Sequence, residues 1–340
     1  MKAALYDPDG GYYERADRER WGRAGDYRTS PERSLLFAAT FARYFARLYE
    51  ELGRPDVWTI VECGAGAGNF AAGVLDTFAR QFPGVFTATS YVVYDVSEDA
   101  RRRAQERLVE FGERVRFCSD WDQIAVDHGI VFSNELLDAF PVHRVVQTDE
   151  GLRELYVTLD EGGSFAWGTG ELSTPRLSEF CRTPSLQLVP GQVIEINLEI
   201  NDWFARVARS IANGFVITVD YGVEAADLYN SSLRPNGTLR GFRRHEFVDD
   251  VLSAPGEYDI TASVNWTQVK SVGESLGFKV VEFASQDKFL MNAGLLLELE
   301  YQLGLAQTEA EKASLTTGAR EMILPGGMAS SFQVLVQRRV

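Results

Sequence analysis

Residues 60–69, with the sequence IVECGAGAGN, place one acid and three closely spaced glycines after an apolar run. The acid is Glu62, and the glycines are Gly64, Gly66 and Gly68. Because glycine has no Cβ, its backbone can turn sharply at the end of a strand and come close to a ligand. The spacing therefore predicts a ligand-binding loop, and the ligand must tolerate a neighbouring carboxylate.

Two classes of cofactor bind glycine loops of this kind. Dinucleotide sites favour G-x-G-x-x-G, with the pyrophosphate at a helix N-terminus, whereas this chain has G-x-G-x-G. A carboxylate at Glu62 would repel a pyrophosphate. S-adenosylmethionine (SAM) has no phosphate but carries an ammonium and a sulfonium, so we expect the loop to bind SAM.

Further polar residues follow the next two predicted strands. Asp95 ends one of them, where its carboxylate could accept hydrogen bonds from both ribose hydroxyls of SAM. After the other strand, Asp120 could bind the adenine amine and Trp121 could form an apolar wall. Three alternatives stay open: Glu62 as a loop hydrogen-bonding group, Asp95 as a helix N-cap, and residues 119–121 as a surface turn.

The elements that would position these residues alternate along the chain. An apolar stripe over residues 31–52 predicts a helix that packs on the core or serves a dimer. Strands and amphipathic helices then alternate, which predicts an α/β protein with a mostly parallel sheet and helices on both faces. The predicted strands are 57–62, 90–95, 114–118, 129–133, 214–220, 278–284 and 330–339, and the helices between the first of them are 70–81 and 98–110.

The predicted domain organisation is a short N-terminal part and one large core. Residues 1–56 read as a helical segment on the substrate side, and residues 57–340 read as the core with two insertions. The insertions cover about residues 141–212 and 285–325. We expect a hairpin within 142–168, a helix near 199–212 and a helical second insertion. The hairpin of 142–168 and the helical stretch 286–320 are expected to lie over the ligand crevice and to select the methyl acceptor.

The composition argues against several classes of function. The net charge of −15 and the pI near 4.8 argue against a nucleic-acid partner, which needs a concentrated cationic face. The chain has no run of the ~18 apolar residues that a membrane span requires, and its start lacks an apolar leader, so we expect a cytoplasmic protein. The cysteines Cys63, Cys118 and Cys181 are far apart, so neither a disulfide framework nor a metal site is predicted.

As a whole, the chain resembles the MidA-like class I methyltransferases. The matching stretches run in family order: ALYDPDGGYY (4–13), GDYRTSPE (25–32), VECGAGAGN (61–69), NELLDAFPVHR (134–144), VITVDYG (216–222), GTLRGFRRH (237–245), DITASV (259–264), QDKFLMNAG (286–294) and MASSFQVL (328–335). GDYRTSPE and NELLDAFPV are specific to the family, whereas the glycine loop is generic.

The resemblance implies a Rossmann-like class I fold with a seven-stranded sheet, SAM as cofactor and, from the family's best-known member, N-methylation of a protein arginine. It implies SAM contacts at Glu62, Gly64, Gly66, Gly68, Asp95 and Asn134. The chain departs from the family where Gly73 replaces an aspartate, Ser263 a histidine and Asn265 an aspartate. If the strand with Ser263 and Asn265 lines the acceptor pocket, the substrate has changed.

The candidate catalytic residues are Asn134, Glu135 and Asp138, which follow the predicted strand 129–133. Ligands of an open parallel sheet bind beyond the carboxyl ends of its strands, and methyl transfer mainly requires an oriented nucleophile. An arginine acceptor stays protonated, so we expect Glu135 and Asp138, three apart on a helical turn, to hold its guanidinium together. Alternatively, both acids begin a helix. His245 is either a proton acceptor or a surface hydrogen-bonding group.

Four functions remain open at this point. The first is a protein-arginine methyltransferase with a protein partner. The second, which Ser263 and Asn265 favour, is a methyltransferase that tailors a small molecule or peptide. The third is an assembly factor that binds SAM without turnover, and the fourth is an NAD-dependent dehydrogenase. A homo-oligomer is compatible with each of them.

Overall fold

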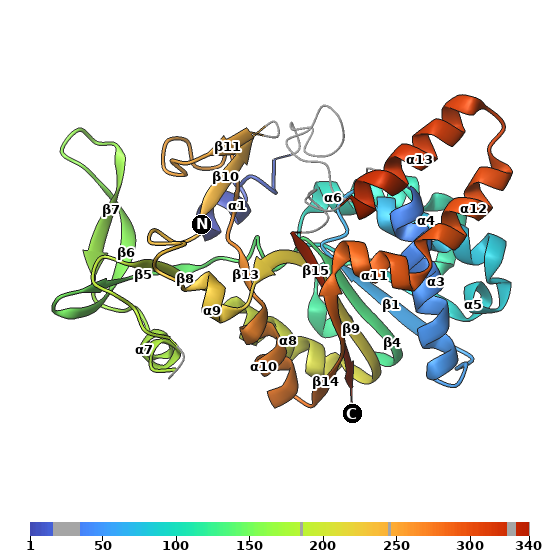
Figure 1. Ribbon diagram of the computed structural model, residues 1–340, viewed down its shortest axis with the longest axis horizontal. Coiled ribbons are helices and arrows are strands. Elements are labelled where there is room, and N and C mark those ends of the chain that lie inside the picture. The colour runs from blue at the N-terminus through green and yellow to red at the C-terminus, as the bar shows by residue number, and fades with distance from the viewer. Residues whose placement is uncertain (16–34, 184–185, 244–245, 325–330, 340) are drawn as a thin grey trace. The chain divides into compact units, whose positions relative to one another are not determined.

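The computed structural model describes residues 1–15, 35–183, 186–243, 246–324 and 331–339 (Figure 1). The chain forms two compact units. Unit 1 comprises Met1–Asp17, Leu137–Phe204 and Gly222–Val272, and unit 2 comprises Arg18–Leu136, Ala205–Tyr221 and Gly273–Val340. The division predicted at residue 56 therefore differs from the observed one, because the chain passes between the units several times.

Unit 2 is built on a mostly parallel sheet. Seven strands follow the order β14-β15-β9-β4-β1-β2-β3; an eighth strand, β13, pairs with the last residues of β9, Gly222 and Val223, which belong to unit 1. The bounds are β1 (Trp58–Cys63), β2 (Thr89–Tyr94), β3 (Val115–Cys118), β4 (Val126–Asn134), β9 (Ile211–Val223), β13 (Val264–Asn265), β14 (Phe278–Ser285) and β15 (Phe332–Arg339). Six of the seven strands run in one direction, and β15 runs in the opposite direction. The predicted α/β class and the mostly parallel seven-stranded sheet are confirmed.

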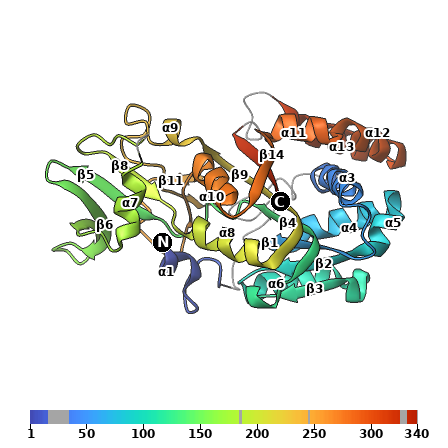
Figure 2. The same ribbon diagram turned by 90° about the horizontal axis from the view of Figure 1, so that it is seen from below.

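One face of this sheet carries the main apolar core. It lies under α3 (Leu35–Glu51), α4 (Asn69–Gln81), α5 (Pro83–Ala88), α11 (Gln286–Ala293), α12 (Leu295–Leu305) and α13 (Glu309–Ile323), several of which are seen from below in Figure 2. Phe70 of α4 stacks on Phe132 of β4, with ring centroids 4.2 Å apart, and Phe41 of α3 contacts both rings. Such aromatic pairs add about 0.5–1.5 kcal/mol each beyond burial. The apolar stripe of the predicted helix 31–52 is therefore used in the core, although residues 31–34 lie outside the described part.

Helices also cover the opposite face of the sheet. They include α6 (Glu98–Arg107), which contacts β2 and β3, and the unit 2 ends of α8 (Glu199–Ser210) and α10 (Trp266–Ser275), both of which begin in unit 1. A Cβ on Gly273 of α10 would lie 2.0 Å from Nε2 of Gln337 on β15, so helix and strand are in close contact there. The expectation of helices on both faces is thus confirmed.

Gly73 has a packing role in unit 2. It lies in α4, and a Cβ at this position would be 2.5 Å from the Cβ of Ala38 in α3. No side chain fits that space unless the two helices move apart. The departure from the family's aspartate therefore accompanies a close approach of α3 and α4.

The second insertion is helical, as predicted. Its helix α12 buries Glu298 completely. The Glu298 carboxylate accepts hydrogen bonds from Arg43 Nε of α3 at 2.7 Å and from Gln81 Nε2 of α4 at 2.8 Å. A buried charge is tolerated only when it is paired in this way. This network ties α12 to α3 and to α4, the helix that follows the glycine loop.

Unit 1 contains two smaller antiparallel sheets, with strand orders β7-β6-β5-β8 and β11-β10-β12. Their strands are β5 (His143–Thr148), β6 (Gly151–Leu159), β7 (Phe165–Gly170), β8 (Val193–Ile196), β10 (Arg240–Arg243), β11 (Glu246–Val248) and β12 (Asp259–Thr261), and the short helices are α1 (Lys2–Tyr6), α7 (Pro175–Cys181) and α9 (Ala225–Leu228). The predicted hairpin is found as β6 and β7, but it is only part of a four-stranded sheet that β8 completes.

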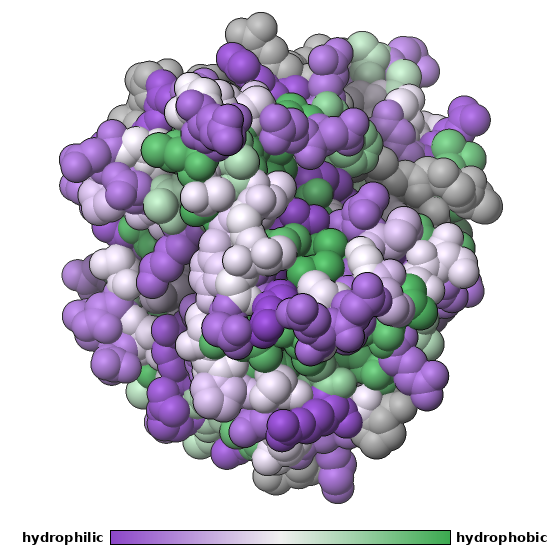
Figure 3. All heavy atoms as spheres, turned by 90° about the vertical axis from the view of Figure 1, so that its left-hand side faces the viewer, coloured by the Kyte–Doolittle hydropathy of each residue, from purple (hydrophilic) through white to green (hydrophobic). Residues whose placement is uncertain are grey.

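The surface carries scattered apolar residues. The β6–β7 hairpin of unit 1 leaves Val157, Leu159, Phe165 and Trp167 exposed. On the face in Figure 3, small hydrophobic groups lie among hydrophilic residues. Among the helices of the described ranges, none is long and apolar enough to cross a membrane.

Candidate functional site

The glycine loop after β1 has a backbone that only glycine adopts easily. The φ angles of Gly64, Gly66 and Gly68 are +69°, +53° and +74°. L-residues rarely adopt these values. Space is limited as well, because a Cβ on Gly64 would lie 3.1 Å from Leu136 Cδ1, and one on Gly68 would lie 3.1 Å from the Cβ of Ala104. The loop thus exposes bare backbone just before α4.

Asp95 is directly attached to this loop. Its carboxylate accepts a hydrogen bond from the backbone N–H of Gly66 at 3.1 Å and another from the N–H of Ser97 at 2.9 Å. The N-cap of α6 is Ser97, whose hydroxyl accepts from Ala100 N–H at 3.4 Å. The alternative that Asp95 caps the helix is therefore wrong. Asp95 instead holds the loop from the end of β2, and its contact with the SAM ribose stays a prediction.

Glu62 lies on β1 just before the loop and is only 5% exposed. Its carboxylate accepts a hydrogen bond from the Tyr91 hydroxyl at 2.7 Å, and the backbone N–H of Ala71 also donates to it. The pKa of Glu62 is raised to about 8: burial raises it most and the charge of Asp95 also raises it, whereas hydrogen bonds from Tyr91 and from Ala71 N–H lower it. Within the described residues no cation forms an ion pair with Glu62, so a cationic ligand would find an acid without a countercharge.

The end of β4 places Asn134 and Glu135 side by side. Asn134 Nδ2 donates a hydrogen bond to Glu135 Oε1 at 3.1 Å, while Asn134 Oδ1 is buried and has no hydrogen-bond partner among the described residues. The Glu135 backbone N–H donates to the Val219 carbonyl at 2.9 Å, and its φ is +53°. That conformation costs a non-glycine residue roughly 1–2 kcal/mol, and such strain is typical of functional sites.

The helical turn predicted to carry Glu135 and Asp138 is absent. Residues 135–140 form bends and turns, because Glu135 is left-handed and Pro141 follows directly. The prediction that helical spacing places the two acids on one side is therefore wrong, and so is the alternative that they begin a helix. Asp138 belongs to unit 1, where it is buried and its carbonyl accepts from Ala262 N–H at 3.0 Å. Its catalytic role stays a prediction.

Asp120 and Trp121 form a local turn after β3. The indole N–H of Trp121 donates to Ser210 Oγ of α8 at 2.8 Å, and the ring packs edge-on against Tyr94. The Asp120 carboxylate is exposed and accepts from Asp122 N–H at 3.1 Å, which caps the short helix of residues 121–123. The surface-turn alternative thus describes Asp120 in this structure, while its contact with adenine stays a prediction.

The family departures in unit 1 have structural explanations. Asn265 is buried; its Oδ1 accepts from Gln268 N–H at 3.1 Å in the first turn of α10, and its Nδ2 donates to the Tyr229 hydroxyl at 3.1 Å. Asparagine and aspartate are both good N-caps. Ser263 is half-buried, and its hydroxyl accepts from Arg240 Nη1 at 3.4 Å. Asn265 is therefore a structural cap.

Three of the quoted sequence stretches meet inside unit 1. The Tyr6 hydroxyl donates to the Ala139 carbonyl at 3.0 Å, and the Tyr13 hydroxyl donates to Asp259 Oδ1 at 2.6 Å. These bonds join ALYDPDGGYY to NELLDAFPVHR and to the stretch around DITASV. By contrast, GDYRTSPE and His245 lie outside the described residues.

Tyr91 is the residue that sequence reasoning missed. It lies fully buried in β2, where a phenol needs a hydrogen-bond partner. A tyrosine in the middle of an apolar strand next to the strand of Glu62 was the available signal. No group of three or more metal-ligating side chains occurs in the described part of the chain.

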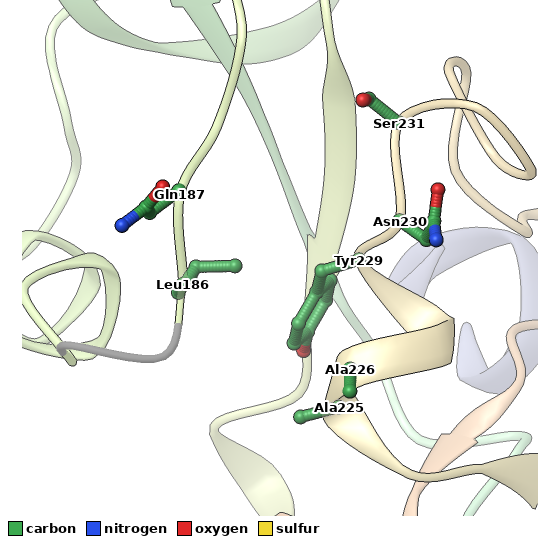
Figure 4. Close-up of a pocket in the computed structure, with 7 residues that line it drawn as sticks. All are labelled: Leu186, Gln187, Ala225, Ala226, Tyr229, Asn230 and Ser231. Atoms are coloured by element: carbon green, nitrogen blue, oxygen red, sulfur yellow. The ribbon is translucent and has the colours of Figure 1, made fainter.

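A surface pocket lies in unit 1, and its lining includes none of the predicted site residues. It has a volume of about 260 Å³ and lies between Leu186 and Gln187 on one side and α9 with Tyr229 on the other (Figure 4). The Tyr229 hydroxyl is engaged with Asn265, and the other lining residues carry no group that titrates near neutral pH. The pocket therefore offers no catalytic group.

Comparison with known proteins places this geometry in a family. Residues 40–284 match the family described as S-adenosyl-L-methionine-dependent methyltransferase. The mitochondrial protein arginine methyltransferase NDUFAF7 of Mus musculus is 26% identical over 360 residues, which cover 98% of this chain and 78% of that protein. Its Homo sapiens counterpart is 24% identical, with 98% and 77% covered.

A solved structure agrees with this match. A crystal structure from Burkholderia thailandensis bound to S-adenosyl-homocysteine is 28% identical, has a TM-score of 0.88, and is matched over 100% of this chain and 86% of that one. The glycine loop and the acid of Glu62 fit SAM on the geometry described above. SAM is therefore the cofactor, and the chain belongs to the MidA-like family of SAM-dependent methyltransferases.

Proposed function

We propose that this methyltransferase transfers the methyl group of SAM to a guanidinium nitrogen of an arginine in a protein substrate. The observation that carries the proposal is the Glu135 carboxylate, fixed at the carboxyl end of β4 by a strained backbone and by Asn134. The names of the relatives from Mus musculus and Homo sapiens support it, since both are protein arginine methyltransferases.

In unit 2, one set of residues would bind SAM and another would orient the arginine acceptor. When bound, SAM supplies an electrophilic methyl group on a sulfonium. The loop backbone at Gly64 and Gly66 and the carboxylate of Asp95 would hold its nucleoside, and Glu62 would face its positive charge. Asn134 Oδ1, which has no partner among the described residues, could accept a hydrogen bond from the SAM ammonium.

Glu135 would act on the acceptor. An arginine guanidinium stays protonated at neutral pH and is a weak nucleophile. A carboxylate that accepts its N–H groups would localise the positive charge and orient one nitrogen toward the methyl carbon. In this transfer the new N–C bond would form as the C–S bond breaks, the electron pair of the C–S bond would stay on sulfur, and the nitrogen would release one proton to solvent. Orientation of this kind can supply roughly 7–11 kcal/mol of the barrier.

The test is radiolabelled methyl transfer to protein, with methylarginine identified after hydrolysis. Glu135→Gln is expected to lower kcat by about 10²–10³ while SAM still binds, because only the acceptor loses its anchor. The exposed Glu113→Gln in the same unit is the control and should leave kcat unchanged. Labelled protein without methylarginine would refute the proposed acceptor.

The alternative of a methyltransferase that tailors a small molecule or peptide was based on Ser263 and Asn265. Asn265 no longer supports it, because this residue is a buried N-cap. Ser263 remains its only support, and product analysis with protein and small-molecule fractions separates the two. An assembly factor without turnover would retain its partner after Glu135→Gln. A cytoplasmic location and a homo-oligomer remain proposals from the sequence.

A further inference from the structure

Glu62 and Tyr91 form a closed pair between β1 and β2. The strands are parallel, with Ile60 opposite Tyr91 and Glu62 opposite Val93, so the phenol reaches along β1 to the acid. Tyr91 is fully buried, and its hydroxyl donates to Glu62 Oε2 at 2.7 Å. The Tyr91 hydroxyl therefore cannot exchange this bond for one with water. The pair lies directly before the glycine loop.

Few polar groups surround Glu62, and the charged one among them is an anion, Asp95. From β2 come the Tyr91 hydroxyl and the Asp95 carboxylate, from α4 comes only the backbone N–H of Ala71, and the next residue on β1 is the thiol of Cys63. Burial and the nearby Glu62 charge raise the pKa of Tyr91, so its phenol stays protonated and always donates. Two neutral donors therefore support the Glu62 carboxylate, and one anion opposes it.

We propose that Tyr91 is a positioning residue for the cofactor: it holds the Glu62 carboxylate at the loop, and ionisation of Glu62 is coupled to the arrival of cationic SAM. This rests on the assignment of Glu62 to the SAM site. It does not depend on the identity of the methyl acceptor, because binding is measured without one.

The coupling follows from proton balance. Burial raises the pKa of Glu62 to about 8, so at pH 7 the free protein holds a proton there. The ammonium and sulfonium of SAM favour the carboxylate, and the proton then leaves to the buffer. SAM binding at pH 7 should therefore release nearly one proton, and the release should fall as the pH rises past the Glu62 pKa.

Calorimetric titration with SAM in phosphate and in Tris measures this release from the difference in heat. Tyr91→Phe should weaken SAM binding roughly tenfold at pH 7, because a hydrogen bond to a charged group is lost. The release should also persist to higher pH, since the lost hydroxyl raises the Glu62 pKa further. Glu62→Gln should remove the release.

Tyr44→Phe is the matched control. Tyr44 is buried on α3, and its hydroxyl donates to Glu282 Oε2 on β14 at 3.1 Å, at the far edge of the sheet from the loop. This variant loses the same kind of bond and should keep the wild-type affinity and proton release.

Three results would overturn the proposal. Wild-type protein that binds SAM with equal heat in both buffers has no coupled proton, whatever the variants do. Tyr91→Phe with unchanged affinity and pH profile would show that the phenol positions nothing. Glu62→Gln with wild-type proton release would instead refute the assignment of Glu62, and none of these results bears on the arginine acceptor.

Discussion

The two units use buried acids in different ways. In unit 2, Glu62 is supported by neutral donors, and burial raises its pKa to about 8. In unit 1, burial also raises the pKa of Glu154, but hydrogen bonds from His143, Ser173 and Tyr156 outweigh it and leave the pKa lowered. A buried carboxylate that accepts several hydrogen bonds, such as Glu154, stabilises the fold. A buried carboxylate with no cation beside it, such as Glu62, can instead bind a cationic ligand.

The units also differ in how their parts are assembled. Unit 2 is a mostly parallel sheet in which Glu62, the glycine loop and α4 follow one another along the chain, and Asp95 comes from the end of the next strand. Unit 1 holds two antiparallel sheets, each built within one segment of chain, Leu137–Phe204 or Gly222–Val272, while Met1–Asp17 contributes α1. Local backbone chemistry thus determines the cofactor loop, whereas hydrogen bonds from Tyr6 and Tyr13 join the separate segments of unit 1.

The largest effect is expected at the glycine loop. Gly66→Val places a branched side chain at φ +53° and fills the space next to the ligand, so SAM affinity should fall by more than about 100-fold. Calorimetry measures it. Gly53→Val is the control, because Gly53 also has a positive φ, of +83°, but a Cβ there meets nothing within 4 Å. Normal SAM binding by Gly66→Val would remove the loop from the site.

The next largest effects are expected for substitutions of the buried acids Glu154 and Glu62, which should change the pH dependence of stability in opposite directions. Glu154→Gln should destabilise the protein by about 1–3 kcal/mol at pH 7, because three donors lose a charged acceptor. Because its folded pKa is lowered, the stabilisation from Glu154 is present above the unfolded pKa near 4.3 and lost as the pH falls through the folded value. The loss in Glu154→Gln should therefore shrink in acid, as urea unfolding will measure.

Glu62 should show the opposite pH dependence. Its folded pKa of about 8 lies above the unfolded value, so the folded state binds more protons and the free protein loses stability as the pH rises from about 4.5 to about 8. Glu62→Gln should unfold with a flatter pH profile across this window. If wild type and Glu62→Gln show the same profile in urea unfolding, Glu62 is not protonated in the free protein.

The smallest effect is expected at the family departure in unit 1. Asn265→Asp keeps an N-cap for α10 and should change stability by less than about 0.5 kcal/mol, whereas Asn265→Ala should cost about 1 kcal/mol. Thermal unfolding measures both. Neither variant should alter SAM affinity; a changed product with Asn265→Asp would instead place the residue at the acceptor.

The sequence predicted those features of the fold that depend on local residue types and spacing. The spacing of Gly64, Gly66 and Gly68 predicted the loop, and alternating periods predicted the strands of unit 2, because both are local features. The helical turn at Glu135 was predicted wrongly, since its left-handed backbone depends on the Val219 carbonyl from a distant strand. Strand β8 and the bond from Tyr91 to Glu62 also arise from pairing between separate segments, which periodicity does not encode.

A crystal structure with S-adenosyl-homocysteine bound tests the central claim most directly. We expect the nucleoside to lie against the backbone of Gly64 and Gly66, with its ribose hydroxyls on Asp95 and its amino group facing Glu62 or Asn134. A nucleoside bound at any other place in the chain, with the loop empty, would contradict this account.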